Sequence, residues 1–305
     1  MTMKVDIYKY LIATVMLMLW LQSCNKQDND PDTKAYPILF NSLETRAAAS
    51  LDDIKADGFR VYAYLQGNTG NSETFEKYVQ YNSGQNVWTY DGIQYWIPET
   101  QYWFKAFYPT DVSFGSLTVD NTDSGQRYTI KGLDINEQKE VMVATANASV
   151  GVGALSPTSG SVVNLKFDHI LACVVLKVKS EIDGVSITSV KLSGVRDNAT
   201  FNGSSWESTN ETTIDYTGNT DLVRGADFVD VTGGGILVVP GPTDGVELTI
   251  NNEDKYTATL TAPTSWEIGK KYTYTVEIKQ NDIIFNEPQV KQWDSESATG
   301  SVIIK

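Results

Sequence analysis

The chain has 305 residues, enough for about two domains of ordinary size, and carries 24 basic and 38 acidic side chains for a net charge of −14. A surface this acidic repels nucleic acid and anionic lipid head groups, so neither is expected as a partner. Two cysteines and a single histidine leave too few residues for a Cys/His zinc site.

The first 23 residues have the pattern of an export signal. Two lysines precede an apolar run of 12 residues, 10–21, which is shorter than the roughly 20 residues needed to span a bilayer. The stretch LQSC at 21–24, with small Ser23 directly before Cys24, resembles the lipobox of bacterial lipoproteins. The resemblance implies cleavage after Ser23 and lipid on Cys24, which would hold the protein to a membrane. An ordinary secretory signal that happens to contain a cysteine is the alternative.

The segment after the signal is expected to be a lipidated tether, residues 24–35. Between 25 and 34 it has no large apolar side chain. Removal of residues 1–23 would leave 22 basic and 37 acidic residues, a net charge of −15. Since Cys173 is the one other cysteine, lipid on Cys24 would exclude an intramolecular disulfide, and stability must come from a packed core.

Beyond the tether the sequence indicates short strands and turns, and helical periodicity is hard to find. The first six candidate strands are 59–65, 76–81, 86–90, 102–108, 128–131 and 140–146. Turn sequences rich in Gly, Asn, Asp and Ser separate them. A long apolar run over 162–178 follows, in which alternate residues from Val163 to Val175 share one face. Its last residues are apolar on both faces, so we expect the run to bend.

A second set of strands begins after the polar residues 179–184. Its members are 187–192, 212–216, 236–239, 246–251, 256–261, 272–279 and 300–305. A spacing of roughly eight to twelve residues is typical of β-sandwiches, and no helices are available to cover parallel sheets. The sequence therefore predicts an all-β fold of two tandem antiparallel β-sandwich domains, 36–180 and 181–305.

No catalytic constellation stands out, so we expect neither an enzyme nor a cofactor or metal. His169 lies on the apolar face of the 162–178 run, which favours a hydrogen-bonded core residue over a general base. The triple glycine at 233–235 precedes a strand instead of a helix, which argues against a phosphate-binding loop. A pair of carboxylates for glycoside hydrolysis stays open, because their separation depends on the three-dimensional structure.

An aromatic cluster over 88–103 is a candidate glycan-binding surface. Six Trp and Tyr residues fall within this stretch, and we take Trp88, Tyr95 and Trp96 as the candidate glycan contacts. The alternative, which we favour, is that alternate members pack a small core while the rest cover its edge.

Several stretches, in order along the chain, resemble the fimbrillin-like (Mfa-like) proteins of Bacteroidales. They are WIP at 96–98, YWFKAFYP at 102–109, VNLKFDHILA at 163–172, ILVVPG at 236–241, WEIGKKYTY at 266–274 and QW at 292–293. They look like that family's aromatic strand ending in Tyr-Pro, its Phe-x-His strand, an apolar strand, the start of a late strand and a near-terminal tryptophan. One departure is Gly241, where the family has glutamine.

The resemblance implies two transthyretin-like β-sandwich domains and a structural or accessory subunit, at the tip or anchor, of a bacterial surface fimbria. It further implies an outer membrane lipoprotein at the cell surface that polymerises with other fimbrial subunits, contacts host or bacterial surface ligands and takes part in adhesion. Many members of the family are cut after an arginine by a trypsin-like protease. The cut frees an N-terminal strand and opens a groove for a strand from a neighbouring subunit.

Carried onto this sequence, the resemblance makes Arg46 and Ala47 the candidate processing site, on a loop downstream of the alternating segment 36–41. Arg60, the next arginine, lies inside a predicted strand and would be shielded. The candidate donor strand is Val302, Ile303 and Ile304. Either terminal segment can instead complete the sheet of its own domain. The competing interpretation of the whole chain is a monomeric glycan-binding lipoprotein at the cell surface.

Overall fold

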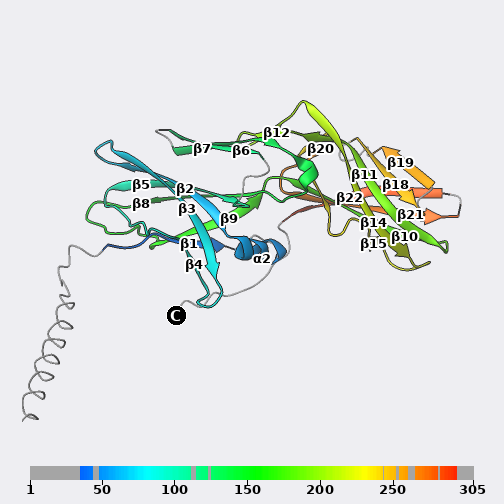
Figure 1. Ribbon diagram of the computed structural model, residues 1–305, viewed down its shortest axis with the longest axis horizontal. Helices are drawn as coiled ribbons and strands as arrows, with labels where there is room; N and C mark the ends of the chain where they lie inside the picture. The colour runs from blue at the N-terminus through cyan, green and yellow to red at the C-terminus, as the bar shows by residue number, and fades with distance from the viewer. Residues whose placement is uncertain are drawn as a thin grey trace, which may run out of the picture. The chain divides into compact units, whose positions relative to one another are not determined.

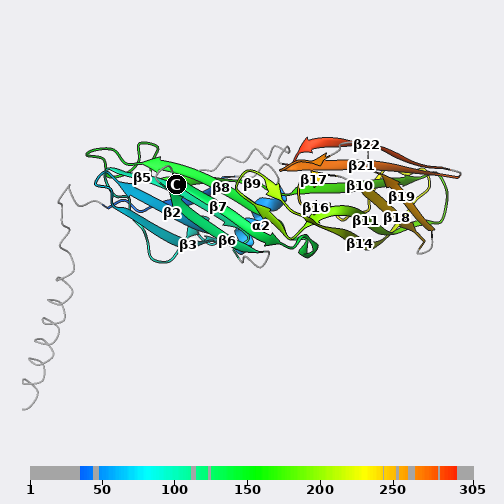
Figure 2. The same ribbon diagram turned by 90° about the horizontal axis from the view of Figure 1, so that it is seen from above.

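Strands make up almost all of the chain that can be described, which confirms the all-β class. The computed structural model describes residues 35–43, 48–110, 115–122, 125–242, 244–251, 254–259, 265–280 and 282–293. The described residues from Pro37 onward belong to one compact unit. Its strands lie side by side in twisted sheets, seen in two orthogonal directions in Figure 1 and Figure 2.

The largest sheet has seven strands and includes the first strand of the described chain. Its order is β1-β9-β8-β5-β2-β3-β4. The bounds are β1 Leu39–Leu43, β2 Phe59–Gly67, β3 Ser72–Asn82, β4 Val87–Thr89, β5 Thr100–Tyr108, β8 Met142–Ser149 and β9 Val162–His169. Neighbours in this sheet are antiparallel except β1 and β9, which run parallel. Purely antiparallel sheets were expected, and this pair departs from that expectation.

A four-stranded sheet, in the order β13-β12-β7-β6, is built from two distant parts of the chain. The bounds are β6 Ser116–Thr122, β7 Gly125–Leu133, β12 Ala199–Phe201 and β13 Trp206–Glu207, with a 3-10 helix, η1 Ile135–Glu137, after β7. Ala199 of β12 pairs with Leu133 of β7. This pairing crosses residue 180, the predicted division between domains, and that division stays a prediction.

Three further sheets contain the remaining described strands. The five-stranded sheet has the order β15-β10-β21-β22, with β16 also paired to β10; a four-stranded sheet has the order β14-β11-β18-β19; β17 pairs with β20. The bounds are β10 Ala172–Ser180, β11 Val185–Asp197, β14 Asn210–Leu222, β15 Val229–Asp230, β16 Ile236–Val238, β17 Gly241–Pro242, β18 Gly245–Ile250, β19 Asp254–Thr259, β20 Ser265–Trp266, β21 Lys270–Lys279 and β22 Asp282–Gln292. β10 and β21 form a second parallel pair.

The long apolar run that was expected to bend is two strands in different sheets. β9 ends at His169 and β10 begins at Ala172, with buried Ile170 and Leu171 between them. Alternate residues of β9 are buried, whereas the first five residues of β10 are buried on both faces. The change in pattern along the sequence therefore marks the point where the chain passes from one sheet to another.

A helix that the sequence did not predict, α2 Ala48–Asp57, follows β1. Its alanines favour helix, and Gly58 ends it with a positive φ of 77° while its N–H donates to the carbonyl of Ile54 at 2.8 Å. Helical periodicity was hard to find because Ile54 is the one fully buried side chain among those described in α2. The expectation of a chain without helices was wrong at this point.

Apolar side chains fill the space under these sheets. One buried cluster draws on β7, β8, β10, β11, β18 and β21, among other elements. Under the seven-stranded sheet, the rings of Phe59 and Phe167 meet with their centroids 5.2 Å apart, and both side chains are fully buried.

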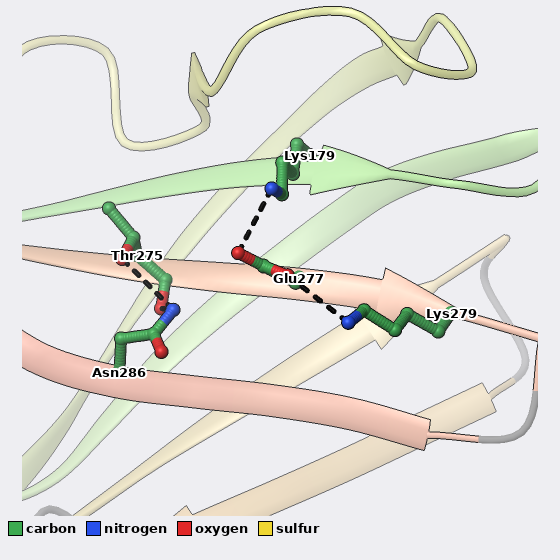
Figure 3. Close-up of polar contacts among 5 residues, drawn as sticks. All are labelled: Lys179, Thr275, Glu277, Lys279 and Asn286. Atoms are coloured by element: carbon green, nitrogen blue, oxygen red, sulfur yellow. Dashed lines mark hydrogen bonds and ion pairs between the residues drawn. The ribbon is translucent and has the colours of Figure 1, made fainter.

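Charged and polar side chains project from β10, β21 and β22 on one face of the five-stranded sheet (Figure 3). The Glu277 carboxylate lies 2.9 Å from the ammonium group of Lys179 and 3.5 Å from that of Lys279. The hydrogen bond from Lys179 is the main cause that lowers the pKa of Glu277. Asn286 donates to the hydroxyl of Thr275 at 3.2 Å, next to a shift in the register of β21 and β22. The side chains on this face are therefore polar, and they form ion pairs and hydrogen bonds with one another.

Candidate functional site

Most of the predicted site residues lie outside the part of the chain that the structure describes. They are Ser23, Cys24, Arg46, Ala47, Val302, Ile303 and Ile304. Lipidation, processing and strand donation by these residues therefore stay predictions. The described candidates are the segment before the processing site and the aromatic cluster.

The segment Pro37–Leu43 lies at one edge of the seven-stranded sheet. β1 runs parallel to β9, with Leu39 opposite Val162 and Leu43 opposite Lys166. The N–H of Leu39 donates to the carbonyl of Ser161 at 3.1 Å, and the side chains of Asn41 and Asn164 are joined by a hydrogen bond of 3.3 Å. β1 thus completes a sheet whose other strands come from residues 59–169.

Alternate side chains of this segment enter the core. Ile38, Phe40 and Ser42 keep 0, 4 and 8% of their surface exposed, whereas Leu39 between them keeps 42%. The Phe40 ring lies 5.4 Å from that of Tyr90 and 5.8 Å from that of Phe104. Full burial of an Ile or Phe side chain contributes roughly 1.5–3 kcal/mol, so loss of this segment would leave an apolar slot that favours refilling.

Residues Tyr90–Trp96, here called the strap, bind the segment on the side away from β9. The N–H of Ile38 donates to the carbonyl of Gln94 at 2.8 Å, and the Tyr90 hydroxyl donates to the carbonyl of Ile38 at 2.6 Å. Pro37 forms an antiparallel bridge with Tyr95. The Trp96 indole N–H donates to the carbonyl of Ser161 at 3.2 Å, which ties the strap to the start of β9.

The connection between β1 and α2 contains the predicted processing site. β1 ends at Leu43 and α2 begins at Ala48, so helix starts directly after the residue that would follow the cut. Residues 44–47, with Arg46 and Ala47, are outside the described ranges. The expected processing site therefore falls between an edge strand and a helix.

Arg60 is shielded, as the sequence predicted. It lies in β2, which pairs with β3 on one side and β5 on the other. Its guanidinium group is 3.3 Å from the Glu76 carboxylate, donates to the hydroxyl of Tyr62 at 3.1 Å and contacts the hydroxyl of Tyr78. A protease binds its substrate as an extended strand with free backbone groups, and the backbone around Arg60 is already paired on both sides.

The three candidate glycan contacts do not form one exposed platform. Trp96 keeps 4% of its surface exposed and meets Tyr102 edge to face with ring centroids 4.7 Å apart. Trp88 is half-buried against Phe59, with ring centroids 4.9 Å apart, while Tyr95 is 48% exposed. The favoured alternative, in which some members pack a core and others cover its edge, agrees with this arrangement. Glycan contact at these residues stays a prediction.

His169 is a buried core residue. Its side chain pairs with the carboxylate of Glu140 and stacks on the Trp293 ring, with centroids 4.0 Å apart and planes 6° apart. Among the described ranges, no three His, Cys, Asp or Glu side chains gather closely enough to hold a metal ion. No helix within those ranges has the length and apolar character to cross a bilayer.

Sequence reasoning missed the strap as the partner of Ile38. The alternation of Ile38 and Phe40 was visible, but it gave neither the parallel pairing with β9 nor the contact with Tyr90 and Gln94. A turn sequence, Asp91-Gly92, lies between Tyr90 and Gln94, and it is a local sign that the chain changes direction within the strap.

A family model described as fimbrillin-like matches residues 45–293. A fimbrial protein from Bacteroides vulgatus is similar, with 17% identity and a TM-score of 0.59, over 85% of this chain and 99% of that one. A candidate cell adhesion protein from Bacteroides uniformis has 18% identity and a TM-score of 0.53, over 86% of this chain and 99% of that one. None of the curated proteins compared with the chain matches it.

Proposed function

The chain belongs to the fimbrillin-like family and has the role of a fimbrial subunit, and on that premise we propose that it assembles by exchanging β1 for a strand of a neighbouring subunit. The observation that carries the proposal is the position of β1. It is a five-residue strand at the edge of a sheet, its inward side chains fill an apolar slot, and it ends three residues before Arg46.

Cleavage after Arg46 would change the thermodynamics of this strand. While the chain is intact, the strand is tethered and rebinds at a high effective concentration. After a cut, it is held by non-covalent contacts alone and a competing strand can replace it. The vacated slot would expose unpaired backbone groups of β9 and the strap, which an incoming strand satisfies by β-augmentation.

Head-to-tail exchange of this kind gives an open filament, because donor and acceptor surfaces differ and the contact does not close on itself. The candidate donor is the segment Val302–Ile304. Lipid on Cys24 would carry the subunit to the outer membrane before assembly and would be removed together with residues 24–46 by the cut. A role at the tip or anchor and contacts with surface ligands agree with the family resemblance.

The test is controlled cleavage. An arginine-specific protease should cut the protein between Arg46 and Ala47, as seen by mass spectrometry, and oligomers should then appear on size-exclusion chromatography. Arg46→Gln should stay uncut there and monomeric. Arg224→Gln is the matched control, because Arg224 is an exposed arginine paired only with Asp183 among the ion pairs described. Oligomers that form equally from uncut protein would contradict the proposal.

A further inference from the structure

We propose that the strap, together with the residue before β9, selects the strand that replaces β1. It would do so by holding the strand's backbone from both sides at the positions of Ile38 and Leu39 and by offering three pockets of different size. The inference rests on the proposed exchange of β1 and specifies its ligand. The ligand is an extended peptide segment with an aliphatic, an aromatic and a small residue at alternate positions, and with a free N–H at the first of them.

The clamp differs from ordinary addition of a strand to a sheet edge. Ile38 offers its N–H to the carbonyl of Gln94, at 2.8 Å, and its carbonyl to the hydroxyl of Tyr90, at 2.6 Å. The next residue, Leu39, turns to the opposite side and donates to Ser161 at the start of β9. The segment is therefore held from both sides within two residues. A proline at the Ile38 position would lose the bond to Gln94 and is excluded.

Tyr90 joins the two parts of this recognition. Its hydroxyl donates to the carbonyl of Ile38 and accepts a hydrogen bond of 3.2 Å from the N–H of Gln94. Its ring packs against Phe40, the second buried side chain of the segment. Burial raises the pKa of the Tyr90 phenol, so the hydroxyl remains a donor at neutral and mildly alkaline pH. One side chain thus contacts both the backbone and the central side chain of the strand.

The three inward positions of the segment hold side chains of different size and polarity. The Ile38 side chain is fully enclosed, the Phe40 ring fills the space between Tyr90 and Phe104, and the third position holds serine with 8% of its surface exposed. A bulky residue at the Ser42 position would overfill its site, and an aliphatic one at the Phe40 position would underfill it.

This rule ranks candidate strands. The segment Tyr36–Leu43 satisfies it, because it has isoleucine, phenylalanine and serine at the inward positions. If the segment Val302–Ile304 entered the slot with Val302 and Ile304 at the first two inward positions, it would bring no aromatic ring to the second and would rank lower. We therefore expect this slot to prefer a strand with an aromatic residue two positions after an aliphatic one.

Uptake of a synthetic peptide by the protease-cut protein tests the inference. The probe is a fluorescently labelled peptide with the sequence YPILFNSL, residues 36–43, measured by anisotropy. Phe40→Ile and Ile38→Pro in the peptide should each weaken binding by about tenfold or more. Leu39→Ala in the peptide is the control, because Leu39 faces outward, and it should bind within about twofold of the parent.

Protein variants test the strap itself. Tyr90→Phe removes only the hydroxyl and should weaken uptake of the parent peptide by about tenfold, because the Ile38 carbonyl loses its donor. Tyr78→Phe, at an exposed tyrosine of β3 outside the strap, should leave uptake unchanged, and circular dichroism should show that both variants fold.

The outcomes distinguish a failure of β1 exchange from a failure of selection by the strap. If the cut protein takes up no YPILFNSL peptide, the exchange of β1 fails and the selection rule fails with it. If it takes up the parent peptide, but equally well the Phe40→Ile peptide, or if Tyr90→Phe binds like the parent protein, exchange stands and selection by the strap is refuted.

Discussion

Truncation of Phe40 to alanine is expected to loosen β1 without unfolding the rest of the protein. Phe40 keeps 4% of its surface exposed, and its ring contacts those of Tyr90 and Phe104. Aromatic-to-alanine substitutions in cores cost about 3–5 kcal/mol, and a strand at the end of a sheet can relax by parting locally. We take about 3 kcal/mol as the free energy lost from β1 docking, which corresponds to roughly a hundredfold rise in the open population.

Hydrogen exchange followed by mass spectrometry measures this opening. The peptide covering 36–43 should exchange roughly a hundredfold faster in Phe40→Ala, while peptides from β5 and β9 keep most of their protection. Leu39→Ala is the matched control in the same strand. Because Leu39 is 42% exposed, its truncation should cost less than about 1 kcal/mol.

Two results would refute this reasoning. Equal acceleration by both variants would show that burial of the inward face does not hold β1. Uniform acceleration across all peptides in Phe40→Ala would show that β1 opens only when the whole protein unfolds, so it could not be exchanged separately.

Three further predictions concern the rest of the described chain. Gly58→Ala should lower the melting temperature, because Gly58 has a φ of 77° and a Cβ there would lie 2.5 Å from the carbonyl oxygen of Val79. Gly184→Ala is the control that separates backbone strain from the clash, because Gly184 has a φ of 73° and its Cβ would meet nothing within 4 Å. Arg60→Gln should leave the fragments of arginine-specific cleavage unchanged, and loss of a fragment would contradict the shielding of β2. Burial raises the pKa of Tyr128 and Tyr274 from 10 to about 12, so between pH 10 and 12 the native state binds more protons than the unfolded state. The free energy of unfolding should therefore fall over this window, and the urea midpoint of Tyr274→Phe should fall less steeply than that of the parent protein.

Strand positions could be read from the sequence where one face is buried. The alternation in β9 and the aromatic alternation in β5 follow directly from a sheet with one side on the core. The run from β9 into β10 could be recognised as a bend because its burial changes from one face to two. β6 was not predicted, since its apolar residues Leu117 and Val119 are followed at once by polar ones.

Long-range pairing could not be read in the same way. Nothing local to β1 specifies a parallel partner more than a hundred residues away, because that choice depends on which edge remains free after β8 and β9 have paired. Helix α2 escaped prediction because one buried residue, Ile54, produces no periodic stripe. The strap contact is of the same kind, since Tyr90 and Gln94 act through their hydroxyl and backbone groups, which leave no pattern in the sequence.

A reversible disulfide between β1 and β9 is the most direct test of the exchange. Asn41 and Asn164 are paired across the two strands, and their side chains are hydrogen-bonded. The double variant Asn41→Cys with Asn164→Cys can therefore lock β1 in place when oxidised. The native Cys173 should not interfere, because it is buried and burial raises the pKa of its thiol to about 11.

After cleavage at Arg46, the oxidised variant should remain monomeric on size-exclusion chromatography, and addition of dithiothreitol should restore oligomers. If the oxidised, cut protein instead polymerises as fast as the reduced one, β1 does not leave its slot during assembly.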